Sequence, residues 1–364
     1  MRNINFRAMG CGMTAMLDAH TPVVDAALAN VPAWFERWEQ SFSRFRPDSE
    51  LSQLNRARGW QTISTDLCHV IDTALLAAEW SGGLVVPNLL TALEQAGYDE
   101  SFERLADSTS MQQKNVRVGT LGMARTGYRS APSQSAKPET GTGTERDATA
   151  SVPYDQKNRD SSQARNDSLL ADADWREIKL DPRQSKVWLP EGMRLDLGGI
   201  AKGWAAQHAA QMLGITAPAL VDAGGDIAIS SPRIDGEPWV VAVDDPRSPE
   251  SNEPIELLLL QSGGVATSGR NYRHWMHNGA MQHHIIDPRT GLPAQTDVLS
   301  ATVVAPSAVM AEIAAKAVLI LGSDDGLTWI ESNQLLAALL VRDDGTIVHS
   351  SRLAHSGHLV EGLL

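Results

Sequence analysis

A polar segment separates two apolar, periodic parts of the chain and limits how the chain can fold. Residues 107–172 are rich in Ser, Thr, Gln, Asn, Gly and Lys, contain few large aliphatic residues and show no alternation of polar and apolar positions. Such a composition lacks the apolar surface that would offset the entropy lost on ordering. We therefore expect residues 107–172 to be a flexible insertion, and residues 1–106 and 173–364 to be two parts of the same domain.

The apolar spacing outside this segment indicates an α+β fold. Apolar residues recur at helical spacing in residues 23–42, 66–80, 201–213 and 308–321. Runs typical of β-strands lie at residues 186–189, 219–222, 239–243, 256–261, 300–304 and 347–349. We expect these strands to form mixed or antiparallel sheets flanked by the helices.

Net charge, the length of apolar runs and the N-terminal sequence limit the partners and the location that we expect for the chain. There are 44 Asp and Glu against 31 Lys and Arg, which gives a net charge of -13 and argues against binding to nucleic acid. The apolar runs are far shorter than the roughly 20 residues of a membrane-spanning helix, so we expect no membrane insertion. The N-terminal sequence has no apolar signal region, and we expect a cytoplasmic protein unless an export signal precedes the sequence.

A glycine pair before a predicted helix is a candidate phosphate site. Gly198 and Gly199 would expose backbone N–H groups at the start of that helix, and Lys202 follows within its first turn. The same residues also suit a tight turn with no ligand. Taken alone, the motif leaves both interpretations open.

Two further motifs could contact a ligand near the backbone. Gly224, Gly225 and Asp226 follow a predicted strand, and would either let a ring or phosphate approach closely or form a hairpin turn. Thr267 and Ser268 lie in a sequence typical of a glycine-bounded turn. Their hydroxyl groups would either face a ligand or cap the turn.

Two adjacent histidines precede a turn sequence. On a strand, His283 and His284 would point to opposite faces, so only one of them can enter a given pocket. An imidazole titrates near neutral pH and can move a proton, although a surface or core histidine is an equally simple interpretation. Asp287 begins an Asp-Pro-Arg-Thr-Gly sequence typical of a turn, and would orient the histidine or the turn itself.

Together, and in this order, the motifs resemble those of the ApbE family of flavin transferases. The resemblance rests on FRAMG ending at Gly10, SRF at residues 43–45, SELSQLN ending at Asn55, DLGGIAKGW from Asp196, DAGGDI from Asp222, VATSG from Val265 and HHIIDPRTGLP from His283. It implies a T-fold-like α+β body that binds FAD and transfers FMN to a threonine hydroxyl of a target flavoprotein, releasing AMP. Water as the acceptor would make an FAD pyrophosphatase, and a decayed site would leave an FAD-binding carrier or regulator.

The resemblance also implies roles for single residues. Met9 and Asn55 would join the glycine motifs in binding FAD, and Trp204 is the tryptophan best placed to stack on a flavin. His284 would act as a general base or proton relay near the acceptor hydroxyl, with Asp287 orienting it or the turn.

The chain departs from the family at the magnesium site. Relatives hold the metal with an aspartate, a threonine four residues later and a backbone oxygen of the GGIAKG region. The matching positions here are Glu312, Lys316 and Ala201. An ammonium group cannot ligate a metal, and Glu312 and Lys316 also have the spacing of an ordinary helical ion pair. We therefore expect magnesium to bind weakly or not at all.

Overall fold

The structure, a computed structural model, describes residues 1–102, 104, 117–118, 174–248, 251 and 253–355. The described residues on both sides of the polar segment belong to one unit. The expected insertion at residues 107–172 lies outside the described residues, except for Arg117–Val118, which form strand β4. No helix in the described ranges is both long and apolar enough to cross a membrane.

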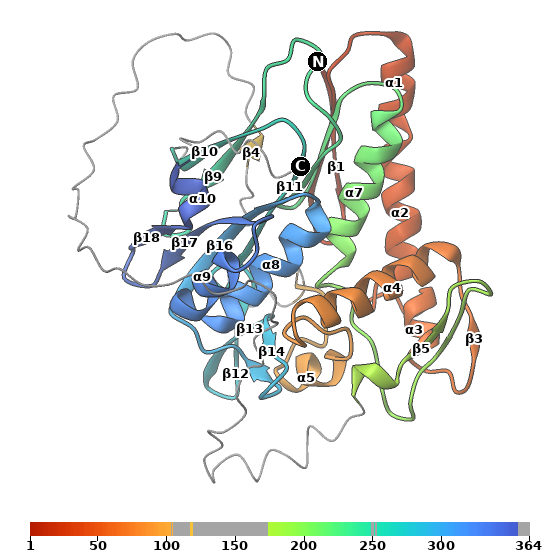
Figure 1. Cartoon of the computed structure of the whole chain (residues 1–364). Coiled ribbons are helices and arrows are strands. Elements are labelled where there is room, and N and C mark those ends of the chain that lie inside the picture. The colour runs from red at the N-terminus through yellow and green to blue at the C-terminus, as the bar shows by residue number, and fades with distance from the viewer. Residues whose placement is uncertain (103, 105–116, 119–173, 249–250, 252, 356–364) are drawn as a thin grey trace, which may run out of the picture. The chain divides into compact units, whose positions relative to one another are not determined.

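An eight-stranded sheet forms the centre of the fold (Figure 1). Its strand order is β1-β2-β7-β8-β11-β16-β17-β18, and every pair of neighbours is antiparallel. The α+β fold is therefore confirmed, with the sheet in its antiparallel form. The strands are β1 (Arg2–Ala8), β2 (Cys11–Leu17), β7 (Ala219–Ala223), β8 (Asp226–Ile229), β11 (Gly263–Gly269), β16 (Val298–Ala305), β17 (Ala337–Arg342) and β18 (Ile347–His349).

The two faces of the sheet carry different cores because successive residues of a strand point in opposite directions. In β7, Val221 packs in the core that includes the helices, whereas Leu220 packs in the core shared with a smaller sheet. This smaller sheet has the order β10-β9-β4, with β10 at Pro254–Leu260 and β9 at Trp239–Asp244. The described chain is thus layered as helices, central sheet and small sheet.

Two alanine-rich helices, α7 (Ala201–Gly214) and α8 (Ala308–Leu321), lie side by side against the central sheet (Figure 1). Their approach is so close that glycine is required at the contacts. A Cβ atom at Gly264 of β11 would lie 2.2 Å from the backbone nitrogen of Ala308, and one at Gly203 would lie 2.7 Å from Glu312 Oε2. This close packing brings the start of α7 next to the middle of α8.

Further helices and small sheets complete the fold. The helices are α1 (Pro22–Ala29), α2 (Val31–Phe42), α3 (Glu50–Leu54), α4 (Thr65–Trp80), α5 (Leu90–Gln95), the 3-10 helix η2 (Trp175–Glu177), α9 (Ser323–Glu331) and α10 (Ser351–His355). A three-stranded sheet contains β3 (Gln61–Thr62), β6 (Lys186–Trp188) and β5 (Lys179–Asp181). Two small hairpins pair β12 (His274–His277) with β13 (Ala280–His283), and β14 (Ile286–Asp287) with β15 (Leu292–Pro293).

Two expectations about local structure are wrong. The single helix predicted at residues 23–42 is broken at Asn30 into α1 and α2, because Pro32 lacks the N–H that a continuous helix would donate to Leu28. The VATSG motif is not a turn but most of strand β11, paired with β8 and β16. Ala266, a small residue of this motif, packs in the same core cluster as residues of α8, which lies against this strand.

Gly264→Ala should lower the free energy of unfolding by about 3 kcal/mol, because the added methyl group would overlap the backbone at the start of α8. Denaturant titration measures this loss. Gly236→Ala is the matched control, since it has a positive φ of 80° but open space around its Cβ position, and should cost about 1 kcal/mol. Equal losses in the two variants would contradict the packing argument.

Candidate functional site

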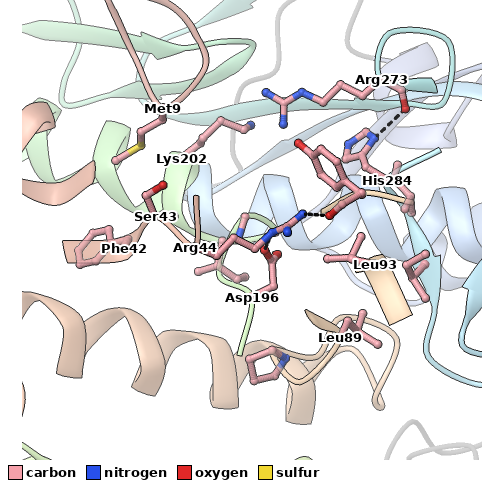
Figure 2. Close-up of a pocket in the computed structure, with 18 of the residues that line it drawn as sticks. Met9, Phe42, Ser43, Arg44, Leu89, Leu93, Asp196, Lys202, Arg273 and His284 are labelled. Carbon is pink, nitrogen blue, oxygen red and sulfur yellow. Dashed lines mark hydrogen bonds and ion pairs between the residues drawn. The ribbon is translucent and has the colours of Figure 1, made fainter. Parts of the chain in front are cut away.

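Two cavities, of about 260 and 90 Å³, share one wall. The residues that line both are Gly198, Lys202, Arg273, His284 and Lys316. Figure 2 shows the side chains of Lys202 and Arg273 pointing toward one another, with His284 next to Arg273. The shared wall therefore combines three basic side chains with an imidazole.

The expected ligand-binding motifs divide between the two cavities. Met9, Gly199 and Ala201 line the larger cavity. The smaller cavity is lined by residues of the other two glycine motifs, namely Gly224, Gly225, Asp226, Thr267 and Ser268. Segments from both parts of the sequence thus meet around one continuous site.

Tight hairpin turns position the backbone at the cavity edges. Met9 and Gly10 both have positive φ, 49° and 70°, in the turn that joins β1 to β2. Gly224, with φ 68°, lies in the turn between β7 and β8, and a Cβ atom there would lie 2.6 Å from the Sγ atom of Cys11. The DAGGDI motif is therefore both a hairpin turn and a cavity wall.

Four charged side chains meet at the shared wall, the two lysines half-buried and the two carboxylates buried. Lys202 of α7 forms an ion pair with Asp226 of β8, and its Nζ lies 3.7 Å from Glu312 Oε1 on α8. Lys316 Nζ donates to the same Glu312 oxygen at 2.9 Å. The other Glu312 oxygen accepts the backbone N–H of Gly203 at 2.9 Å. Glu312 is fully buried, so both its oxygens are used inside the protein.

The carboxylates keep the Lys202 ammonium charged. Burial alone would lower the pKa of Lys202, but the nearby carboxylates of Asp226 and Glu312 raise it above its usual value. Burial, together with the Glu312 charge, raises the pKa of Asp226 despite its ion pair with Lys202. The cluster thus keeps Lys202 protonated despite its burial.

His284 is neutral near physiological pH. Burial, followed by the positive charges of Arg273 and Lys316, lowers the pKa of the imidazole well below its usual value. Its Nδ1 atom lies 3.4 Å from the backbone oxygen of Arg273 (Figure 2). Because a carbonyl oxygen only accepts, this contact favours the tautomer protonated at Nδ1 and leaves the Nε2 lone pair able to take a proton.

The neighbouring histidine lies elsewhere. His283 ends strand β13, and its Nε2 atom lies 3.1 Å from the backbone oxygen of Ala294. It lines neither of the two cavities described above. Of the two histidines, His284 is the one that enters the site.

Three residues expected at the ligand support the site from outside these cavities. The side-chain amide of Asn55 donates to and accepts from the backbone of Leu195, both at 2.8 Å, and so fixes the segment before the Gly198 turn. Asp287 accepts from the guanidinium of Arg289 at 2.8 and 2.9 Å and holds its own turn rather than His284. Trp204 is only 2% exposed and packs against aromatic rings of α2, which excludes stacking on a ligand in this conformation.

Two arginines of the site were not predicted. Arg273 lies in the short interval between the VATSG and HHIIDPRTG motifs and lines the larger cavity. Its place between two ligand-binding motifs is the only sequence feature that could have pointed to it. Arg44, within the SRF motif, pairs with Asp196 at 2.8 Å. Its guanidinium lies 4.0 Å from the ring centroid of Phe45 and 4.6 Å from that of Tyr98, and all three residues line the larger cavity. Figure 2 shows Arg44 beside Asp196.

The residues at the expected magnesium site do not fit this metal. Both oxygens of Glu312 already accept hydrogen bonds, and Lys316 presents an ammonium group where a ligand oxygen would be required. Within the described ranges, no three His, Cys, Asp or Glu side chains form a group that could hold a metal. Ala201 lines the larger cavity, but one backbone oxygen does not make a magnesium site.

The chain is similar to known proteins of one family. The model of the ApbE family matches residues 9–340. A Haemophilus influenzae protein named FAD:protein FMN transferase is 32% identical over 183 residues, which cover 49% of this chain and 53% of that protein. A Treponema pallidum protein of the same name is 28% identical over 339 residues, covering 88% of this chain and 78% of that one. The chain thus spans about half the length of the first relative and more of the second.

Solved structures show the same fold. The ApbE protein of Thermotoga maritima superposes with a TM-score of 0.71 at 24% identity, covering 97% of this chain and 98% of that one. The flavin transferase ApbE of Vibrio cholerae superposes with a TM-score of 0.66 at 21% identity, covering 96% and 97%.

Asp222 gives the site a pH-dependent stability. Its Oδ1 atom accepts the N–H of Gly225 at 2.7 Å, and burial raises its pKa to about 7. An unfolded aspartate ionises at about pH 4. Between about pH 4 and 7 the folded state therefore keeps a proton on Asp222 that the unfolded state has released. The stabilisation from this group is complete below about pH 4 and is lost as the pH rises through about 7.

Asp222→Asn keeps the acceptor for Gly225 and removes this titration. The melting temperature of the variant, relative to the native protein, should rise by about 2 °C or more between about pH 4 and pH 8. Thermal denaturation of both proteins across this range measures the difference. A difference that stays constant with pH would contradict the assignment.

Proposed function

This chain belongs to the ApbE family, and we propose that it transfers FMN from FAD to a threonine hydroxyl of a target protein. The observation that carries the proposal is the wall shared by two cavities, with Lys202, Arg273, Lys316 and the neutral His284 in it. FAD consists of two ring-bearing halves joined by a diphosphate. Each cavity would take one half, and the diphosphate would lie at the cationic wall.

The shared wall suits the transfer of a phosphoryl group from FAD to a hydroxyl group. The threonine oxygen attacks the phosphorus on the FMN side, the bond from that phosphorus to the bridging oxygen breaks, and AMP leaves with the bridging oxygen. His284 Nε2 takes the hydroxyl proton. The charges of Lys202, Lys316 and Arg273 stabilise the negative charge on the phosphoryl oxygens and the leaving AMP. No step is assigned to magnesium, because the residues at its expected site do not fit it.

The larger cavity suits a planar ring. Phe45 and Tyr98 lie on its wall with the Arg44 guanidinium packed against both rings, and aliphatic side chains such as Leu84 and Leu89 complete a largely apolar lining. The Arg44–Asp196 ion pair fixes this wall relative to the Gly198 turn. A ring bound here would therefore be held close to the diphosphate position.

The proposal is tested by incubating the protein with FAD and a target domain that contains the acceptor threonine. Mass spectrometry of the target and chromatography of the nucleotides should show the added FMN and an equal amount of AMP. A Thr→Ala target is the control and should stay unmodified. Free FMN with AMP and an unmodified target would instead indicate a pyrophosphatase, and unchanged FAD would indicate a carrier.

His284→Asn should reduce the rate of transfer by about a hundredfold or more, because asparagine cannot accept the hydroxyl proton. FAD affinity should change much less, so the loss should appear in kcat. His283→Asn is the matched control, since this neighbour lines neither cavity, and should keep nearly native turnover. Near-native turnover of His284→Asn would remove the histidine from the mechanism.

A further inference from the structure

Lys316 occupies an unusual position for a lysine on a helix that packs on a sheet. Its side chain is only 15% exposed, yet it lines both cavities. Its Cε atom lies 3.5 Å from the Cβ position of Gly199, so the chain runs across the glycine turn at the start of α7. The ammonium group therefore reaches the shared wall while remaining bonded to Glu312.

The surroundings of Glu312 leave no position for a divalent cation. One oxygen faces the ammonium groups of Lys316 and Lys202, at 2.9 and 3.7 Å, and the other accepts the Gly203 N–H. A metal ion bound to this carboxylate would have to displace at least one of the ammonium groups and would lie beside the other. Electrostatic repulsion would oppose both outcomes.

The charges at the wall already suit an anion. Lys202, Lys316 and Arg273 are opposed by the carboxylates of Asp226 and Glu312, which leaves a positive charge in excess where the cavities meet. Lys316 has three donor hydrogens and uses one for Glu312. Its remaining donors can bond to phosphate oxygens in the cavities.

We infer that the Lys316 ammonium replaces the divalent cation in this chain, so that FAD is bound through its diphosphate without any metal. This inference rests on the proposed function only in taking FAD as the ligand. It makes Lys316 a binding residue for the diphosphate, with Glu312 as the group that positions it. The positive charge is then part of the protein and does not depend on the concentration of metal outside it.

The test is equilibrium dialysis of the flavin-free protein with FAD, in the presence of EDTA or of magnesium chloride. The native protein should show the same Kd within about twofold in both solutions. Lys316→Met should weaken FAD by about tenfold or more, because charge-assisted hydrogen bonds to the phosphates are lost. Lys316→Arg, which keeps the charge, should recover most of this loss. Lys186→Met removes the same charge from strand β6, where Lys186 is half-buried and lies outside both cavities, and should bind FAD as the native protein does.

A native protein whose FAD affinity falls about tenfold or more in EDTA would overturn the inference. So would a Lys316→Met variant that binds FAD as tightly as the native protein and has an unchanged melting temperature. If Lys316→Met fails to fold, the inference is still tested by the FAD affinity of the native protein in EDTA against magnesium chloride, and by the FAD affinity of Lys316→Arg. Metal-independent FAD binding without transfer to any target would reject the proposed reaction and leave this inference standing.

Discussion

The architecture of the site depends on one group of charges, two buried carboxylates and two half-buried lysines, that joins three elements. Lys202 belongs to α7, Asp226 to β8, and Glu312 and Lys316 to α8. Each carboxylate faces at least one ammonium group, and removing one partner of such a buried pair typically costs about 3–5 kcal/mol, because a charge is left uncompensated. The same contacts that hold α7 and α8 to the sheet therefore also aim two ammonium groups at the cavities.

Small residues make this charge group possible. Glu312 can accept the backbone N–H of Gly203 only because residue 203 has no side chain, since a Cβ atom there would lie 2.7 Å from the carboxylate. The start of α8 likewise rests on Gly264 of the sheet. A larger residue at position 203 would push α7, and Lys202 with it, away from Glu312, and one at position 264 would push α8 away from the sheet. Packing and electrostatics at this site are thus one constraint rather than two.

The sequence predicts local features well and distant pairings poorly. The helix at residues 308–321 has the predicted limits, because a continuous apolar pattern is bounded by a capping serine and a glycine. The pairing of Asn55 with Leu195 joins positions 140 residues apart, and no local pattern contains it. The position of Trp204 just after a glycine motif predicts a ligand contact, but helical spacing turns its ring toward α2. The VATSG motif has the composition of a turn and becomes a strand through its neighbours.

The placement of His284 links ligand binding to proton transfer under the proposed function. Two causes depress its basicity: burial, which disfavours the charged imidazole, and the positive charges of Arg273 and Lys316. A diphosphate bound at the same wall would oppose the second cause, because its negative charges lie against those two cations, while burial would persist. The imidazole would then be least basic in the empty site and more basic once the substrate is in place. The same cations can therefore bind the diphosphate and keep the histidine unprotonated before it binds.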